Sequence, residues 1–234
     1  MEGYREFEFF RGKVRFRQPK SHRLSIVEIL FVANLRGIRR KSKVIDLGAG
    51  FGALSILIAL KHGCHVWAVE RDPCMLELLR YNVEINGLSQ KVHVVGEDIR
   101  SLKDLFEPQY FDVVVTNPPF YRDKVSTNAY HHEKDTTLED FIRVGGFLLR
   151  DGGSFNLLIA SNRIIDAISF MKSSNMGITS LRFFYPKINK NGKIMLIHAL
   201  KNLRPVPNIE RPLIINDEKG EYTQEVKDIL DGFL

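Results

Sequence analysis

The stretch Val44-Ile-Asp46-Leu-Gly48-Ala-Gly50-Phe-Gly52 joins a short apolar run to three closely spaced glycines. The run predicts a buried strand, and the apolar pattern over residues 53–61 predicts a helix directly after it. Glycines between a strand and a helix permit a tight turn and the close approach of a ligand to the backbone. The stretch therefore predicts an α/β fold with a ligand site where its first core strand ends.

Short apolar runs alternate with helical patterns from Lys43 onward, which predicts a mostly parallel sheet with helices on both faces. Strands are expected over residues 44–47, 65–70, 92–96, 111–116, 154–160, 179–184 and 193–200, and helices over 53–61, 74–86, 136–149 and 163–175. We expect a basic N-terminal extension over residues 1–42, with a strand over 14–17 and a helix over 24–35. The core is expected over 43–201, and a C-terminal extension packed on it over 202–234, with a helix over 223–230.

The glycine spacing indicates the kind of ligand. It reads G-x-G-x-G, whereas a dinucleotide fingerprint reads G-x-G-x-x-G. Asp46 stands two residues before the first glycine, where it would repel a pyrophosphate and attract a cationic group. S-adenosylmethionine has a sulfonium, an amino group and no phosphate, so it fits this turn.

Acidic residues also follow the next two predicted strands. Glu70 ends the second strand and is suited to hydrogen-bond both hydroxyls of a ribose. Asp98 ends the third strand beside Ile99, where a carboxylate can meet an adenine amino group. Each acid alone could be a helix cap or a solvated loop residue. Their common position at strand ends favours a ligand site.

The fourth predicted strand ends abruptly in Asn117-Pro118-Pro119-Phe120. Because prolines cannot donate to a sheet ladder, the strand tip is open. The Asn117 amide oxygen and the Pro118 carbonyl could accept the two N–H bonds of a planar amine, and Phe120 could stack on its ring. The alternative is a turn in which the Asn117 side chain bonds locally.

Composition limits the broad class. The chain has 234 residues, of which 44% are hydrophobic and 26% charged, as expected for one large globular domain with small extensions. No stretch approaches the roughly 20 apolar residues of a membrane span, and the first residues predict no secretory signal. Cys64 and Cys74 form neither a disulfide framework nor a four-ligand metal site. We expect a cytoplasmic protein without a metal.

The net charge of +6 is concentrated near the N-terminus. Phe10 and Phe16 alternate with basic residues there, a pattern suited to phosphate contacts and base stacking. The alternative is an edge strand kept soluble by its charges. The residues predicted to contact a nucleic acid are Arg11, Lys13, Arg15, Arg17, Lys20 and Arg23, together with Tyr121, Arg122 and His131 after the fourth strand. The adjacent His131 and His132 point to opposite sides of an extended segment, so a shared metal is not expected.

These features resemble the class I S-adenosylmethionine-dependent methyltransferases over residues 43–200. The resemblance implies a Rossmann-like seven-stranded sheet whose last strand, over 193–200, is antiparallel. It also implies roles for the residues already singled out. Asp46, Gly48 and Gly50 would line the methionine moiety, Glu70 and Arg71 would lie at the ribose, Asp98 and Ile99 would frame the adenine, and Asn117 to Phe120 would form the amino-methylase motif, with Asn117 also near the cofactor.

The ends of the chain resemble a narrower group, the tRNA-valine adenine-37 N6-methyltransferase family. Residues 23–31 look like its helix before the core, and residues 213–225 look like its final segment. The resemblance implies a tRNA substrate whose anticodon-loop adenine is extruded and methylated. Two departures are visible, since Val27 and Glu28 stand where the family usually has Asp, and Phe120 stands where it commonly has Tyr.

Two other functions remain open from the sequence. A protein glutamine methylase shares Asn-Pro-Pro-aromatic but usually has a larger N-terminal helical domain. An RNA-binding module could keep the fold without turnover, although Asp46, Glu70 and Asn117 are all present. We expect a monomer or a weak homodimer that binds tRNA and no membrane.

Overall fold

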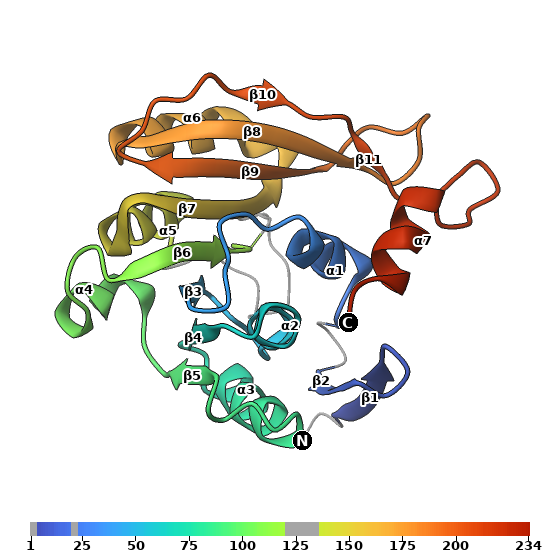
Figure 1. Ribbon diagram of the computed structural model, residues 1–234, viewed down its shortest axis with the longest axis horizontal. Helices are drawn as coiled ribbons and strands as arrows, with labels where there is room; N and C mark the ends of the chain where they lie inside the picture. Colours follow the sequence, from blue (N-terminus) through green and yellow to red (C-terminus); the bar gives the residue numbers. More distant parts are fainter. Residues whose placement is uncertain (1–3, 20–22, 120–135) are drawn as a thin grey trace.

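The computed structural model describes residues 4–19, 23–119 and 136–234. A central nine-stranded sheet dominates this part of the chain, in the order β10-β8-β9-β7-β6-β3-β4-β5, with β11 also paired to β8 (Figure 1). Its strands are β3 (Lys43–Leu47), β4 (His65–Val69), β5 (Val92–Val95), β6 (Phe111–Thr116), β7 (Leu149–Ala160), β8 (Met176–Tyr185), β9 (Ile194–Lys201), β10 (Asn208–Ile209) and β11 (Leu213–Ile214).

The predicted seven-stranded sheet is confirmed, and β9 is its antiparallel strand. β9 pairs antiparallel with both β7 and β8, whereas β3, β4, β5, β6 and β7 pair parallel with one another. The C-terminal segment adds β10 and β11, which pair parallel with the outer edge of β8. Strands of two residues leave no pattern in the sequence, which explains why these two were not predicted.

Helices cover both faces of the sheet. Four of them, α1 (Ile26–Ala33), α2 (Ala53–His62), α3 (Pro73–Ile85) and α7 (Gln224–Asp231), contribute to one hydrophobic core. The other core is formed with α5 (Leu138–Leu148), α6 (Ile164–Ser173), the short α4 (Leu102–Leu105) and the 3-10 turn η1 (Ile99–Ser101). Val44 and Ile45 are neighbours in β3 and belong to opposite cores. A strand buried on both faces reads as a continuous apolar run, and this run made the sheet predictable.

An N-terminal hairpin packs beside α3. It consists of β1 (Arg5–Phe9), which was not predicted, and β2 (Val14–Gln18), paired antiparallel. The N–H groups of Arg15 and Arg17 donate to the side-chain oxygens of Asn86 and Asn82 in α3, at 2.9 and 2.7 Å. These asparagines satisfy an edge of β2 that would otherwise need another strand.

Aromatic residues of the hairpin belong to the core instead of the surface. Phe16 is fully buried, with its ring 5.8 Å from that of Phe51. The ring of Phe10 stacks on that of Phe233 near the C-terminus at 4.8 Å. The prediction that Phe16 stacks on a base was therefore wrong, because its ring is fully buried. Phe10 is half-buried against Phe233, and its contact with a base stays a prediction.

A buried polar network fixes the loop between α1 and β3 to the sheet. Asn156 of β7 accepts the N–H of Arg36 at 2.9 Å and donates to the Arg36 carbonyl at 3.2 Å. Its oxygen also contacts Nδ1 of His198 at 2.9 Å. Burial, reinforced by the positive charges of Arg36 and Arg182, lowers the pKa of His198 to about 3. The imidazole is therefore neutral at physiological pH, and the whole network holds without a counter-ion.

Among the described residues, no helix combines the length and the apolar composition that crossing a bilayer requires. The predicted boundaries at residues 42 and 201 stay a prediction. The flanking segments nevertheless share the core with the sheet, since Phe31, Leu213 and Val226 all belong to the cluster that contains α2.

Candidate active site

A pocket opens at the edge of the sheet where the parallel strands end. The sheet order places the ends of β6, β3, β4 and β5 side by side, and residues after each of these strands line the pocket. Gly48 and Gly50 follow β3, Glu70 follows β4, Ile99 follows β5 and Asn117 follows β6. Open α/β sheets bind their ligands at this edge. Residues that the sequence placed at four separate strand ends thus meet at one pocket.

The turn after β3 requires glycine at defined positions. The φ angles of Gly48, Gly50 and Gly52 are all positive, at 78°, 56° and 93°. A Cβ atom at Gly52 would also lie 2.4 Å from Leu79 Cδ1, so this glycine allows α2 to begin against α3. A Cβ atom at Gly50 would meet nothing within 4 Å, which leaves open backbone on the pocket wall.

Backbone N–H groups hold the carboxylate of Glu70 in place. Gly50 donates to Oε2 and Asp72 donates to Oε1, both at 2.8 Å. Burial raises the pKa of Glu70, while these backbone hydrogen bonds oppose the rise. Since each carboxylate oxygen has two lone pairs, Glu70 keeps acceptor capacity for a pair of hydroxyl groups.

Asp46 lies beneath the glycine turn and has no exposed surface. Its Oδ2 accepts the hydroxyl of Ser55 at 2.6 Å, and its Oδ1 has no hydrogen-bond partner among the described residues. Burial raises the pKa of Asp46 to about 7; the Ser55 hydrogen bond opposes this rise, and the charges of Glu70 and Glu28 add to it. A buried, half-satisfied carboxylate is costly, and a cationic ligand in the adjoining pocket would stabilise it.

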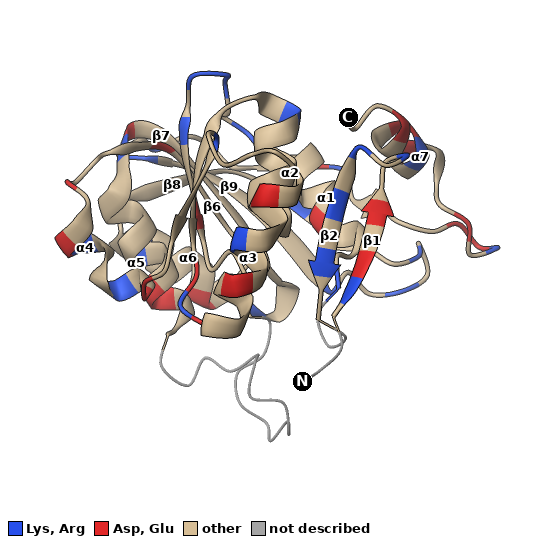
Figure 2. Cartoon of the chain, turned by 90° about the horizontal axis from the view of Figure 1, so that it is seen from below, with Lys and Arg blue, Asp and Glu red and all other residues tan. Residues whose placement is uncertain are grey.

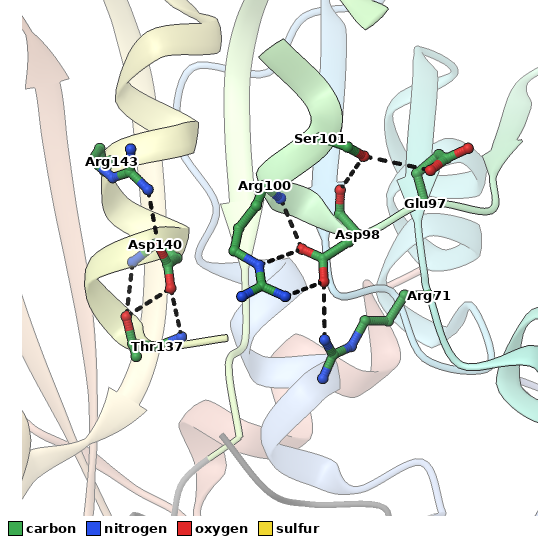
Figure 3. A network of polar contacts seen from close by, with 8 residues as sticks. All are labelled: Arg71, Glu97, Asp98, Arg100, Ser101, Thr137, Asp140 and Arg143. Carbon is green, nitrogen blue, oxygen red and sulfur yellow. Dashed lines mark hydrogen bonds and ion pairs between the residues drawn. The ribbon is translucent and has the colours of Figure 1, made fainter. Parts of the chain in front are cut away.

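Asp98 is held in a network of arginines at the end of β5 (Figure 3). Its Oδ2 accepts from Arg71 at 2.9 Å and from Arg100 at 2.8 Å, and its Oδ1 accepts from the side chain and the N–H of Arg100. These bonds hold the pKa of Asp98 well below its usual range. Glu97 and Ile99 line the pocket, whereas the Asp98 side chain is turned to the arginines. Its contact with adenine stays a prediction.

Asn117 stands at the end of β6, on the pocket wall. The preceding Thr116 donates its hydroxyl to the carbonyl of Leu47 at 2.8 Å, which ties the ends of β6 and β3 together. The Oδ1 atom of Asn117 is buried and has no partner among the described residues. Pro118 and Pro119 have no N–H to donate to it, so a local turn at Asn117 would need residues from Phe120 onward, which lie outside the described part of the chain. Pro119 also lines the pocket.

Part of the predicted site lies outside the described residues, so those predictions stay untested. It comprises Phe120, Tyr121, Arg122 and His131 after β6, and Lys20 in the N-terminal segment.

The pocket also contains residues that were not predicted from the sequence, and three of them come from elements outside the predicted site. Glu28 comes from α1, Thr136 directly precedes the N-cap of α5, and Phe141 lies in α5. The Thr136 hydroxyl oxygen is buried and, like Asn117 Oδ1, has no partner in the described part of the chain. The only sequence signal was the pairing of Ser25 with Glu28, which is typical of a helix cap and conceals any second role.

The basic N-terminal residues are partly engaged within the molecule. Figure 2 shows the positions of basic residues along β2 beside positions of acidic residues in β1. Arg17 pairs with Glu6 at 2.8 Å, and its guanidinium lies 3.6 Å from the centre of the Tyr81 ring. Arg15 donates to the carbonyl of Ile85 at 3.1 Å. The predicted alternative of a charged, solvated hairpin is thus partly realised, and contact with RNA would compete with these pairs.

The remaining predicted RNA contacts border this hairpin. Lys13 donates to the carbonyl of Leu234, and Arg23 lies 5.8 Å from the centre of the Phe7 ring. Arg11 occupies the turn between β1 and β2, with a positive φ of 58° and an exposed side chain.

Comparison with known proteins gives consistent matches. The family model for the methyltransferase small domain matches residues 23–179. A tRNA1(Val) (adenine(37)-N6)-methyltransferase of Porphyromonas gingivalis is 30% identical over 204 residues, covering 81% of this chain and 78% of the relative. A protein of the same name from Cytophaga hutchinsonii is 22% identical over 199 residues, covering 81% of each chain.

A crystal structure of a predicted O-methyltransferase from Agrobacterium tumefaciens superposes with a TM-score of 0.74. It is 23% identical and covers 88% of this chain and 96% of the other. At this identity the superposition shows a shared fold and carries no information on the acceptor atom.

Proposed function

This chain belongs to the methyltransferase small-domain family, and from that membership we propose that it methylates the N6 amine of adenine 37 in a tRNA. The chain is an S-adenosylmethionine-dependent methyltransferase. The tRNA substrate is proposed because the relatives that match about four fifths of this chain carry that activity in their names.

The pocket fits S-adenosylmethionine by its charge. Four of its lining residues are acidic and Arg71 is the only basic one that the described residues contribute. Such a lining disfavours a phosphate-bearing ligand and favours a cation. The unpartnered Oδ1 of buried Asp46 and the open backbone at Gly50 add to this fit. The bound cofactor supplies an activated methyl group on a sulfonium.

One observation supports an amine as the methyl acceptor: Oδ1 of Asn117, on the pocket wall, has no partner among the described residues. An exocyclic amine is a poor nucleophile because its lone pair is delocalised into the ring. Asn117 Oδ1 and the Pro118 carbonyl would accept its two N–H bonds and turn the lone pair toward the methyl carbon. These fixed dipoles would also stabilise the positive charge that develops on nitrogen.

The protein's contribution to the step is then orientation. The nitrogen forms a bond to the methyl carbon as the carbon–sulfur bond breaks, with the electron pair leaving on sulfur. The methylated amine passes its extra proton to water, so no protein base is needed. Holding the two reactants in line supplies much of the rate.

The substrate class is tested by incubating the protein with methyl-labelled cofactor and separate fractions of unmodified tRNA and cell protein. The proposal predicts label in N6-methyladenosine after digestion of the tRNA, identified by mass spectrometry. Label on a glutamine amide, with none in nucleosides, would establish the protein methylase instead. Absence of label from both fractions, with the cofactor bound, would indicate a non-catalytic RNA-binding protein.

A further inference from the structure

Glu28 is a buried acid on the wall of the cofactor pocket. It lies in the first turn of α1, is only 7% exposed and lines the pocket with the residues of the glycine turn. An acid in the first turn of a helix is normally solvated. Burial raises the pKa of Glu28, so its charged form is disfavoured at this position. Its position therefore needs a reason beyond helix formation.

The helix cap accounts for only one of its carboxylate oxygens. Oε2 accepts from the N–H of Ser25 at 2.8 Å and from its hydroxyl at 3.3 Å, which forms a capping box. The structure gives Oε1 no partner among the described residues. The box thus fixes the orientation of the carboxylate and leaves one oxygen available to the pocket.

The strand order gives the pocket two ends. Glu70 after β4 and Ile99 after β5 mark the end where adenosine is expected, and Asn117 after β6 marks the transfer end. Glu28 lines the pocket with the glycine turn after β3, which lies between β4 and β6, and its charge adds to the rise in the pKa of Asp46 in that strand. Glu28 is therefore expected to lie toward the methionine half of the cofactor.

We propose that Glu28 is a cofactor-binding residue whose Oε1 recognises the ammonium group of the methionine moiety, while the buried charge of Asp46 beneath the glycine turn adds to the attraction. Each acid raises the free energy of the other when both are charged, and a cation near both reverses that effect. A hydrogen bond to a charged group is also about twice as strong as a neutral one. The inference rests on the cofactor placement within the proposed function and is independent of the tRNA substrate.

The test compares two ligands on two proteins by isothermal titration calorimetry. One ligand is S-adenosylhomocysteine, and the other is its deamino analogue, which keeps the carboxylate and lacks the amine. Glu28→Gln should weaken S-adenosylhomocysteine binding about tenfold and change the analogue's affinity by less than about twofold. Equal weakening of both ligands, or of neither, would overturn the proposal.

A matched variant separates the charge from the cap. Glutamine at the third helical position still completes a capping box, so Glu28→Gln preserves the start of α1. Ser25→Ala removes the hydroxyl contact to Oε2 and keeps the acid, and it should change S-adenosylhomocysteine affinity by less than about threefold. A loss with Ser25→Ala as large as that with Glu28→Gln would mean that Glu28 acts only through the cap.

The wild-type protein provides a measurement that does not depend on how a variant folds. It should bind S-adenosylhomocysteine at least about tenfold more tightly than the deamino analogue. Equal affinities would show that the pocket does not recognise the amino group of the ligand. These binding data need no RNA, so a failure of the tRNA proposal leaves them interpretable.

Discussion

Replacing Asp46 with asparagine should stabilise the fold at alkaline pH while weakening the cofactor site. Asp46 has no exposed surface, and its Oδ2 accepts the hydroxyl of Ser55 at 2.6 Å. Asparagine has nearly the same shape and no charge. The variant therefore removes the buried charge beneath the glycine turn with little change in packing.

The magnitude follows from the pKa. Burial, countered by the Ser55 hydrogen bond and reinforced by the charges of Glu70 and Glu28, raises the pKa of Asp46 from 3.8 to about 7. Because the folded state binds the proton more tightly than the unfolded state, the contribution of Asp46 to stability is complete below pH 3.8 and is lost as the pH rises through about 7. Between pH 5 and pH 8 this loss amounts to about 2 to 3 kcal/mol.

Urea unfolding of both proteins at pH 5 and pH 8 measures this loss directly. The wild-type free energy of unfolding should fall between the two pH values by about 2 kcal/mol more than that of Asp46→Asn. The remaining acids Glu28 and Glu70 titrate in both proteins, so their effect largely cancels. The same substitution should weaken S-adenosylhomocysteine binding about tenfold or more at pH 8. An equal loss of stability in both proteins would show that the Asp46 charge does not destabilise the fold.

Three further variants test other parts of the site and the fold. Asn117→Ala should lower kcat about 10²–10³-fold with cofactor affinity retained; an equal loss of cofactor binding would mean that Asn117 supports the pocket instead. Asn156→Ala should lower the free energy of unfolding in urea by about 2 kcal/mol, because it leaves buried backbone groups unpaired; an unchanged midpoint would show that the network contributes nothing. Replacing both Arg15 and Arg17 with glutamine should reduce the slope of log affinity for tRNA against log salt by about 2. An unchanged slope would show that Arg15 and Arg17 do not contact the phosphates of the tRNA.

The sheet was predictable because its strands are buried on both faces. Such strands appear as continuous apolar runs, and the helices between them show clear periodicity and caps, as with Pro73 after Asp72. β1 was missed because Arg5–Phe9 is mostly charged, and its pairing depends on charges across the hairpin. Its partner strand is in turn held by the asparagines of α3, which are distant in sequence.

The predicted site was most accurate where function depends on strand ends. Gly50, Glu70 and Asn117 line the pocket because parallel strands deliver their C-terminal residues to one edge. Glu28 was missed because its position depends on how α1 packs against the sheet, which no local pattern reveals. Asp98 was placed at the correct strand end, but neighbouring arginines engage its side chain.

The proposed function is transfer of a methyl group to one tRNA adenine, with Asn117 holding the accepting amine. The direct measurement uses unmodified valine tRNA and a matched transcript in which adenine 37 is replaced by guanine, each treated with wild-type protein or Asn117→Ala. Nuclease fragments are then examined by mass spectrometry. We expect one added methyl group on the fragment containing adenine 37, only with the unaltered transcript and the wild-type protein. Methylation of the altered transcript, or undiminished methylation by Asn117→Ala, would contradict the proposed function.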